Sequence, residues 1–107
     1  MGKPVEIGET GFDKEVLQSG IPVLMYFWGP GCSPCRAVAP VIEELAGDFD
    51  GRIRFVKVNV EECPAISSRY GVMGLPALLV MKAGQPVDTL VGVRSKDDLK
   101  QSLETML

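Results

Sequence analysis

Hydrophobic and polar residues follow two periodicities along this chain, one typical of strands and one typical of helices. Residues 21–28 are almost all apolar, which indicates a strand buried on both faces. Residues 53–60 alternate between apolar and polar side chains, the pattern of a strand with one buried face. Two further runs, 77–81 and 87–91, flank Ala83-Gly84-Gln85-Pro86, whose residue types favour a hairpin turn between antiparallel strands.

Apolar residues at helical spacing predict four helices that alternate with these strands. The helices are expected over residues 10–17, 32–50 and 63–70, with a fourth beginning at Ser95. Pro40 interrupts the second helix, and its missing N–H is expected to kink that helix near Arg36. The buried stripe of the last helix is expected to comprise Leu99, Leu103, Met106 and Leu107.

With a short strand around Val5, the order becomes strand, helix, strand, helix, strand, helix, strand, strand, helix. This order predicts an α/β protein with a central mixed β-sheet of about five strands flanked by four helices. The 107 residues suit one domain over residues 1–107, because a chain of this length buries a core without metal or disulfide staples.

The net charge of −3 argues against nucleic acid as a partner, since binding to phosphates requires a basic surface. No apolar run approaches the length of a membrane span or a signal peptide, so we expect a cytoplasmic monomer without a membrane partner. The chain has no histidine, which excludes Cys-His and Ser-His nucleophile pairs and removes the commonest metal ligand.

Two cysteines lie where the apolar strand 21–28 gives way to a helix, in the motif Cys32-Ser33-Pro34-Cys35. The free N–H groups and positive dipole end of a helix favour a thiolate at Cys32 and lower its pKa. Cys35 lies three residues further along the helix, close enough for a reversible disulfide but pointing further into the protein. Zinc and iron–sulfur sites share this spacing but require further ligands, and Cys63 is the only other cysteine, so no metal is expected.

Several motifs along nearly the whole chain, in order and approximate spacing, make it similar to the thioredoxin family. They are Phe27-Trp28, Cys32-Ser33-Pro34-Cys35-Arg36, Ala39-Pro40, Lys57-Val58-Asn59, Tyr70-Gly71-Val72, Gly74-Leu75-Pro76-Ala77-Leu78 and Val91-Gly92. The resemblance implies a thioredoxin fold and a protein-disulfide reductase with Cys32 as nucleophile and Cys35 as resolving thiol. It also implies a thioredoxin reductase or similar electron donor, protein disulfide substrates and no bound cofactor.

The resemblance implies further residues around the cysteines. Pro76 follows a cis peptide bond in this family and leaves the backbone of Leu75 free to pair with a substrate segment, whereas residue type alone favours a trans proline at a strand start. Gly92 is expected to keep the substrate groove open, and Trp28 to pack beside the cysteine loop as structural support.

Three positions depart from the family pattern. Tyr26 stands where the family buries an aspartate, and a phenol with a pKa of about 10 is no base at neutral pH, so Lys57 loses its usual partner. Gly31 replaces a tryptophan, which reduces the apolar substrate contact surface. Ser33 replaces a glycine while Pro34 is retained, which favours a reducing character.

Alternatives remain open at this stage. Cys63 is either a regulatory or dimerising thiolate at a helix start or a small residue that happens to carry sulfur. A disulfide oxidase or isomerase would use the same cysteine pair with a less stable disulfide. A thioredoxin-like binding or assembly module would not need the thiols at all.

Overall fold

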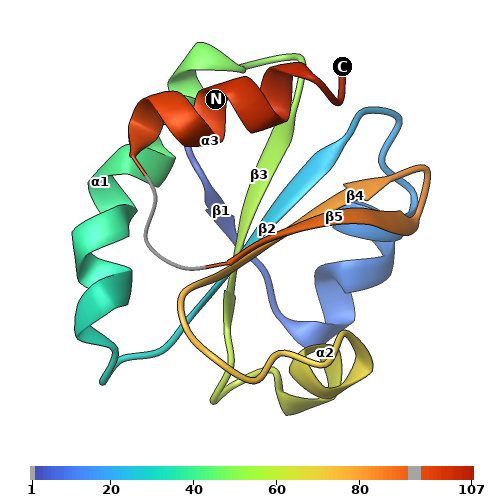
Figure 1. Ribbon diagram of the computed structural model, residues 1–107. Coiled ribbons are helices and arrows are strands. Elements are labelled where there is room, and N and C mark those ends of the chain that lie inside the picture. The colour runs from blue at the N-terminus through green and yellow to red at the C-terminus, as the bar shows by residue number, and fades with distance from the viewer. Residues whose placement is uncertain (1, 92–94) are drawn as a thin grey trace.

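The apolar run that predicts a buried strand forms the middle of a mixed sheet. The computed structural model, drawn in Figure 1, describes residues 2–91 and 95–107, and its strands have the order β1-β3-β2-β4-β5. Strands β1, β3 and β2 are mutually parallel, whereas β4 runs antiparallel to β2 and β5 antiparallel to β4. The strands are β1 (Val5–Glu6), β2 (Val23–Trp28), β3 (Arg54–Asn59), β4 (Ala77–Lys82) and β5 (Gln85–Val91).

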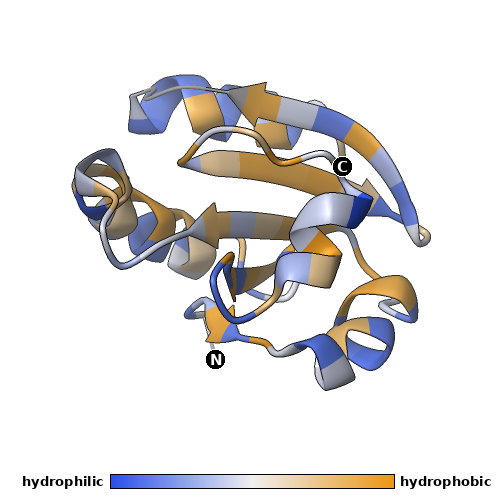
Figure 2. Ribbon diagram, turned by 90° about the horizontal axis from the view of Figure 1, so that it is seen from below, coloured by the Kyte–Doolittle hydropathy of each residue, from blue (hydrophilic) through white to orange (hydrophobic). Residues whose placement is uncertain are grey.

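The strands and helices follow the predicted order along the chain. Helices cover both faces of the sheet. Alternate residues of β2 project to opposite faces: Leu24 and Tyr26 pack with α1 and α3, whereas Met25 and Phe27 pack with η2 and α2. Figure 2 shows mostly apolar residues in the central strands, whereas polar and apolar residues alternate along the helices. The helical elements are η1 (Glu9–Gly11), η2 (Asp13–Leu17), α1 (Ser33–Asp48), α2 (Pro64–Arg69) and α3 (Lys96–Glu104).

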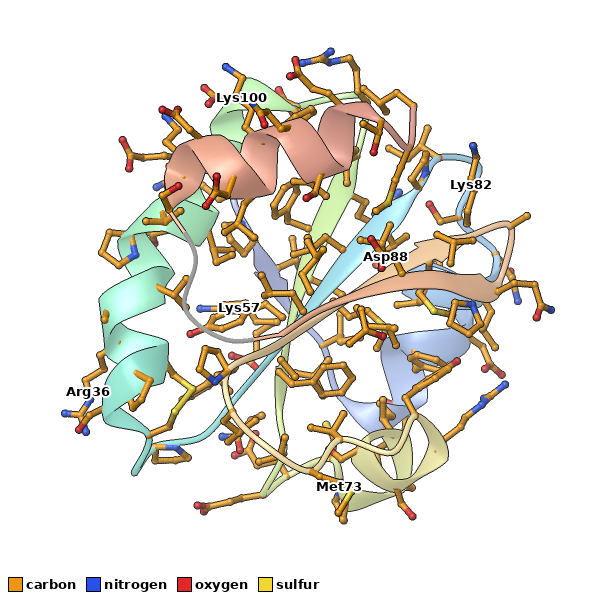
Figure 3. The ribbon with its side chains drawn as sticks, viewed as in Figure 1. Arg36, Lys57, Met73, Lys82, Asp88 and Lys100 are labelled. Atoms are coloured by element: carbon orange, nitrogen blue, oxygen red, sulfur yellow. A yellow bond between two sulfur atoms is a disulfide. The ribbon has the colours of Figure 1, made fainter. Side chains whose placement is uncertain are left out.

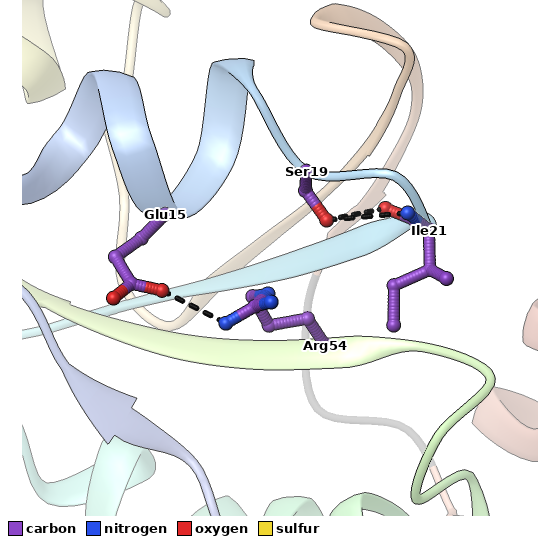
Figure 4. A network of polar contacts seen from close by, with 4 residues as sticks. All are labelled: Glu15, Ser19, Ile21 and Arg54. Atoms are coloured by element: carbon purple, nitrogen blue, oxygen red, sulfur yellow. Dashed lines mark hydrogen bonds and ion pairs between the residues drawn. The ribbon is translucent and has the colours of Figure 1, made fainter.

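The first predicted helix is less regular than its pattern suggests. Residues 9–11 form a 3-10 turn and Asp13–Leu17 a π-helical segment, in which the N–H of Gln18 donates to the carbonyl of Asp13 at 2.9 Å. This segment is tied to the sheet by an ion pair of 2.8 Å between Glu15 and Arg54 of β3 (Figure 4).

The buried stripe predicted for the last helix is wrong at its end. Leu99 and Leu103 are buried, and Ser95 caps α3 by accepting a hydrogen bond from the N–H of Asp98 at 3.2 Å. Helix α3 ends at Glu104, so the helical spacing no longer applies beyond it and Leu107 is 52% exposed. Met106 remains partly buried against the core.

The hairpin expected between the last two strands is confirmed, and α1 runs through Pro40. The hairpin turn places Ala83 at φ 54° and Gly84 at φ 78°, the positive values that a two-residue turn between twisted strands needs. Helix α1 includes Pro40, whose ring leaves the carbonyl of Arg36 without its intrahelical donor. The kink expected there stays a prediction.

Candidate active site

The junction between β2 and α1 brings two sulfur atoms together. Cys32 is the N-cap of α1 and Cys35 lies in its first turn, with Cα atoms 5.3 Å apart and a disulfide between them (Figure 3). Gly29 is buried behind this loop, and a Cβ there would lie 3.2 Å from Cδ1 of Leu75. A glycine at this position therefore lets the cysteine loop lie against Leu75.

The two cysteines differ in exposure and in their surroundings. Cys32 is partly exposed, and its Sγ accepts a hydrogen bond from the N–H of Cys35 at 3.2 Å. Cys35 is only 2% exposed and belongs to the core packed against α1. A reduced Cys32 at this N-cap would have a backbone donor and the helix dipole to stabilise its thiolate. The sequence-based expectation that Cys35 points further inward is confirmed.

Tyr26 lies directly behind the inner cysteine. Its hydroxyl donates a hydrogen bond to the carbonyl oxygen of Cys35 at 2.8 Å, and burial raises its pKa above 10.0. The phenol is therefore neutral at ordinary pH and bonds to the backbone, so its hydroxyl is committed to holding the first turn of α1.

A pocket of about 360 Å³ lies on this side of the sheet, beside Cys35. Lys57 lines it from β3, in register with Tyr26 of β2. Among the described residues Lys57 forms no salt bridge, which agrees with the expected loss of its acidic partner. The wall is completed by Trp28, Gly29, Pro30, Arg36 and Ala39.

Trp28 has a partner that the sequence did not reveal. Its indole Nε1 donates to Oε2 of Glu6 at 3.3 Å, and the side chain packs against the same core cluster as Cys32. Glu6 belongs to β1, which pairs with β3 and not with β2. Only the strand order brings this carboxylate to the active site, and the linear sequence carries no direct signal of that order.

Of the predicted substrate-binding residues, Gly31 belongs to the cysteine loop and Leu75 lies beside Gly29 of that loop. The Leu75–Pro76 peptide bond is cis, as expected from the resemblance; Leu75 is partly buried and Pro76 buried. Gly31 is exposed, and a Cβ there would meet no atom within 4 Å. Gly92 lies outside the described residues. Ser33 and Pro34 are exposed and form the start of α1.

Of the two interpretations left open for Cys63, the structure favours a packed residue over a reactive thiolate. This cysteine is the N-cap of α2, but it is 1% exposed and its side chain makes no capping bond. Its Sγ lies 3.7 Å from the carbonyl oxygen of Ile7. Burial first, and then the charges of Glu9, Glu62 and Glu6, raise its pKa, so the neutral thiol is favoured.

Residues 2–91 and 95–107 contain no group of three or more cysteine, aspartate or glutamate side chains placed to hold a metal ion. None of the helices in this part of the chain is both long and apolar enough to cross a membrane.

Comparison with known proteins agrees with the geometry. The sequence model of the family described as Thioredoxin matches residues 3–105. The chain is 45% identical over 107 residues to Thioredoxin 1 of Nostoc sp., which covers 100% of both proteins. It is 43% identical over 103 residues to the thioredoxin of Staphylococcus haemolyticus, covering 96% of this chain and 97% of that protein. Identity to the chloroplastic M-type thioredoxin of Chlamydomonas reinhardtii is 38% over 101 residues, covering 94% of this chain and 72% of that protein.

Proposed function

The chain belongs to the thioredoxin family and is a thiol–disulfide oxidoreductase, and on this premise we propose a role for each residue of its site. The proposal is carried by one observation, the disulfide between a partly exposed Cys32 and a buried Cys35 at the start of α1. The thiolate of Cys32 attacks a substrate disulfide, which forms a mixed disulfide and releases one substrate thiolate.

Cys35 completes the exchange. Its thiolate attacks Sγ of Cys32, the bond between Cys32 and the substrate breaks, and the second substrate sulfur leaves as a thiolate. When the Cys32–Cys35 disulfide forms, the two cysteines have lost two electrons to the substrate, whose two sulfur atoms take up two protons in all. The proton of Cys35 goes to water or to the departing thiolate, because Tyr26 is a neutral phenol.

The other residues of the site hold the two cysteines in place. Tyr26 holds the backbone of Cys35, and Trp28 packs beside the cysteine loop. Ser33 and Pro34, as the first residues of α1, tune the stability of the disulfide, and Lys57 supports Cys35 from β3.

A substrate segment binds beside Cys32, along the groove formed by Gly31, Leu75, Pro76 and Gly92. The cysteine loop lies against Leu75 at Gly29, which supports this placement. Since Gly31 has no side chain, the segment contacts less apolar surface there than a tryptophan would offer.

Thioredoxins in general receive electrons from a reductase and pass them to disulfides. For this chain we infer a thioredoxin reductase as donor, protein disulfides as substrates, and a single domain over residues 1–107 that acts as a monomer. A reducing compartment such as the cytoplasm fits a buried third cysteine that stays a thiol.

The function is tested by disulfide reduction with dithiothreitol or a reductase as donor, comparing wild type with Cys32→Ser. The wild type is expected to reduce the substrate and the variant to fall to background. Activity that survives the substitution would show a binding module with dispensable thiols instead.

The direction of the reaction is tested by the reduction potential of the cysteine pair. A reduction potential of about −270 mV is expected for a reductant, whereas one of about −120 mV would identify an oxidase.

The role of Tyr26 is tested by Tyr26→Asp, which introduces a base next to Cys35. Release of the substrate from the mixed disulfide is expected to become faster at low pH in the variant. An unchanged pH dependence would show that the side chain at this position does not control the step.

A further inference from the structure

Met73 is the most exposed large apolar side chain among the described residues. It is 99% exposed, whereas Val5, Val87 and Leu107 are only about half exposed. A side chain so exposed contributes almost nothing to the packing of its own protein. Single exposed apolar residues are common on protein surfaces, so its surroundings decide whether Met73 has a role.

The loop that carries Met73 has no charge. Residues 70–77, which join α2 to β4, contain no charged side chain. They line a pocket of about 360 Å³, and none of the described residues around this pocket is charged. Figure 3 shows Met73 beside α2, at the lower end of the molecule. Met73 therefore belongs to an uncharged surface that can accept an apolar partner.

Leu75 connects this surface to the cysteine pair. It lines the same pocket as Met73. It also lies against the cysteine loop, because a Cβ at Gly29 would lie 3.2 Å from its Cδ1. Leu75 and Cys32 pack against the same core cluster. A substrate segment bound along Leu75 and Pro76 is therefore expected to reach the thioether of Met73.

Apolar contact surface is scarce next to Cys32 in the chain. Gly31 has no side chain, and a Cβ there would meet no atom within 4 Å. The thioether of a methionine is flexible and polarisable, so it adapts to apolar partners of different shapes. Met73 can therefore supply apolar contact that Gly31 does not.

Met73 also carries the sulfur that a dissolved oxidant reaches most easily when the protein is in its disulfide form. The other sulfur atoms of the described residues are buried, partly buried or joined in the disulfide; they belong to Met25, Met81, Met106, Cys63, Cys32 and Cys35. Oxidation to the sulfoxide converts an apolar thioether into a polar group and disrupts contacts that depend on methionine.

We propose that Met73 is an apolar contact for the protein substrate, and that a peroxide weakens this contact by oxidising Met73 to the sulfoxide. This inference rests on the proposed function, because the contact matters only if a protein disulfide binds beside Cys32. The sulfur of Met73 attacks one peroxide oxygen, the O–O bond breaks and an S–O bond forms. The sulfur loses two electrons, and hydrogen peroxide is reduced to water. Methionine sulfoxide reductases reverse such a modification.

The site of oxidation is tested first. The disulfide form is treated with hydrogen peroxide, which is then removed with catalase. Trypsin releases Met73 and Met81 in one peptide, residues 70–82, so fragment ions in mass spectrometry show which of them carries the added oxygen. Met73 is expected to be oxidised at least roughly tenfold faster than Met81, and denaturation should equalise the two rates.

Kinetics show whether the modification affects the substrate. With dithiothreitol as donor, peroxide treatment is expected to raise the KM for insulin, a protein disulfide, roughly three- to tenfold. The kcat is expected to stay within about twofold, because the lost contact is a binding contact. A small aromatic disulfide reaches Cys32 without touching Met73, so its turnover is expected to stay within about twofold. Treatment with a methionine sulfoxide reductase should restore the KM for insulin.

Three variants separate Met73 from other sites. Met73→Leu stays apolar but has no sulfur, so peroxide is expected to leave the KM of this variant at its own untreated value. It also separates Met73 from Met1, which lies outside the described residues. Met73→Gln imitates the polarity of the sulfoxide and is expected to raise the KM without peroxide. Leu107→Gln makes the same change at the half-exposed C-terminus, at the opposite end of the molecule (Figure 1), and is expected to keep the KM within about twofold.

Several results would overturn the proposal. One is faster oxidation of Met81 than of Met73, and another is a peroxide-induced rise in KM that persists in Met73→Leu. An unchanged KM for insulin after complete oxidation of Met73 would show that this side chain does not contact the substrate. Equal losses with insulin and with the small disulfide would place the damage at the cysteine chemistry. Turnover that survives Cys32→Ser would instead contradict the proposed function.

Discussion

Cys32 and Cys63 occupy equivalent positions at the starts of two helices but differ in exposure and in bonding. Cys32 follows β2 and caps α1, and Cys63 follows β3 and precedes α2. Both helices carry a proline in their first turn, so local sequence alone makes the two sites look alike. Only Cys32 forms a disulfide in this structure.

Burial, partners and neighbouring charge account for the difference. Cys32 is partly exposed, and its Sγ faces the N–H of Cys35. Cys63 is turned into the core toward the carbonyl of Ile7, and nearby carboxylates disfavour its thiolate. A strand-to-helix junction therefore creates the opportunity for a reactive thiol, whereas the direction of the side chain and the sign of the surrounding charge decide the outcome.

The largest expected difference between the two cysteines is in turnover. Cys32→Ser is expected to reduce disulfide reduction by roughly a thousandfold or more, because it removes the nucleophile. Cys63→Ser is expected to leave turnover of the folded protein within about twofold. The dithiothreitol-driven assay compares the two variants side by side, and an equal loss in both would abolish the distinction.

Chemical labelling provides the next largest contrast. In reduced wild type at neutral pH, iodoacetamide is expected to modify Cys32 at least roughly tenfold faster than Cys63, since alkylation requires an accessible thiolate. Peptide mass spectrometry after timed quenching gives both rates in one sample. Denaturation should equalise them; equal rates in the folded protein would contradict the burial of Cys63.

Cys63, which is expected to matter little for turnover, is expected to matter for the stability of the folded protein. Cys63→Ser buries a hydroxyl in an apolar site and is expected to lower the free energy of unfolding by about 1–3 kcal/mol. Ser68→Ala on the exposed surface of α2 is the control, with an expected change within about 0.5 kcal/mol. Urea denaturation of the oxidised proteins measures both, and a similar small change in both would mean that Cys63 is not packed in the core.

The smallest predicted effect concerns alkaline pH. Burial raises the pKa of Cys63 in the folded protein above its ordinary 9.0, so the folded state holds this proton more tightly than the unfolded state. The resulting stabilisation is complete below pH 9.0 and is lost as the pH rises through the folded-state pKa. In the oxidised protein Cys32 and Cys35 do not titrate. Cys63→Ala is therefore expected to show a shallower decline in unfolding free energy than wild type above pH 9.0, and parallel curves would contradict this.

The sequence predicted most of the fold because its signals are local. The apolar run of β2, the alternation of β3 and the Ala83-Gly84 turn each specify an element without reference to distant residues. The error at Leu107 arose because helical spacing was extended beyond Glu104, where α3 ends.

The site was predictable where it depends on one segment and less so where it depends on several. The cysteine motif and its helix are contiguous, and the cis bond before Pro76 was expected from the family resemblance. The bond of Glu6 to Trp28 and the burial of Cys63 depend on how β1 and β3 pack together, which no short pattern contains.

Trapping the mixed disulfide tests the central claim most directly. Cys35→Ser leaves Cys32 able to attack but removes the thiol that resolves the intermediate, so the protein should accumulate covalently linked to a disulfide-containing substrate. Peptide mass spectrometry of the trapped species is expected to place the substrate on Cys32, and wild type should show little adduct. Attachment to Cys63, or as much adduct in wild type as in the variant, would contradict the assignment of Cys32 as nucleophile and Cys35 as resolving thiol.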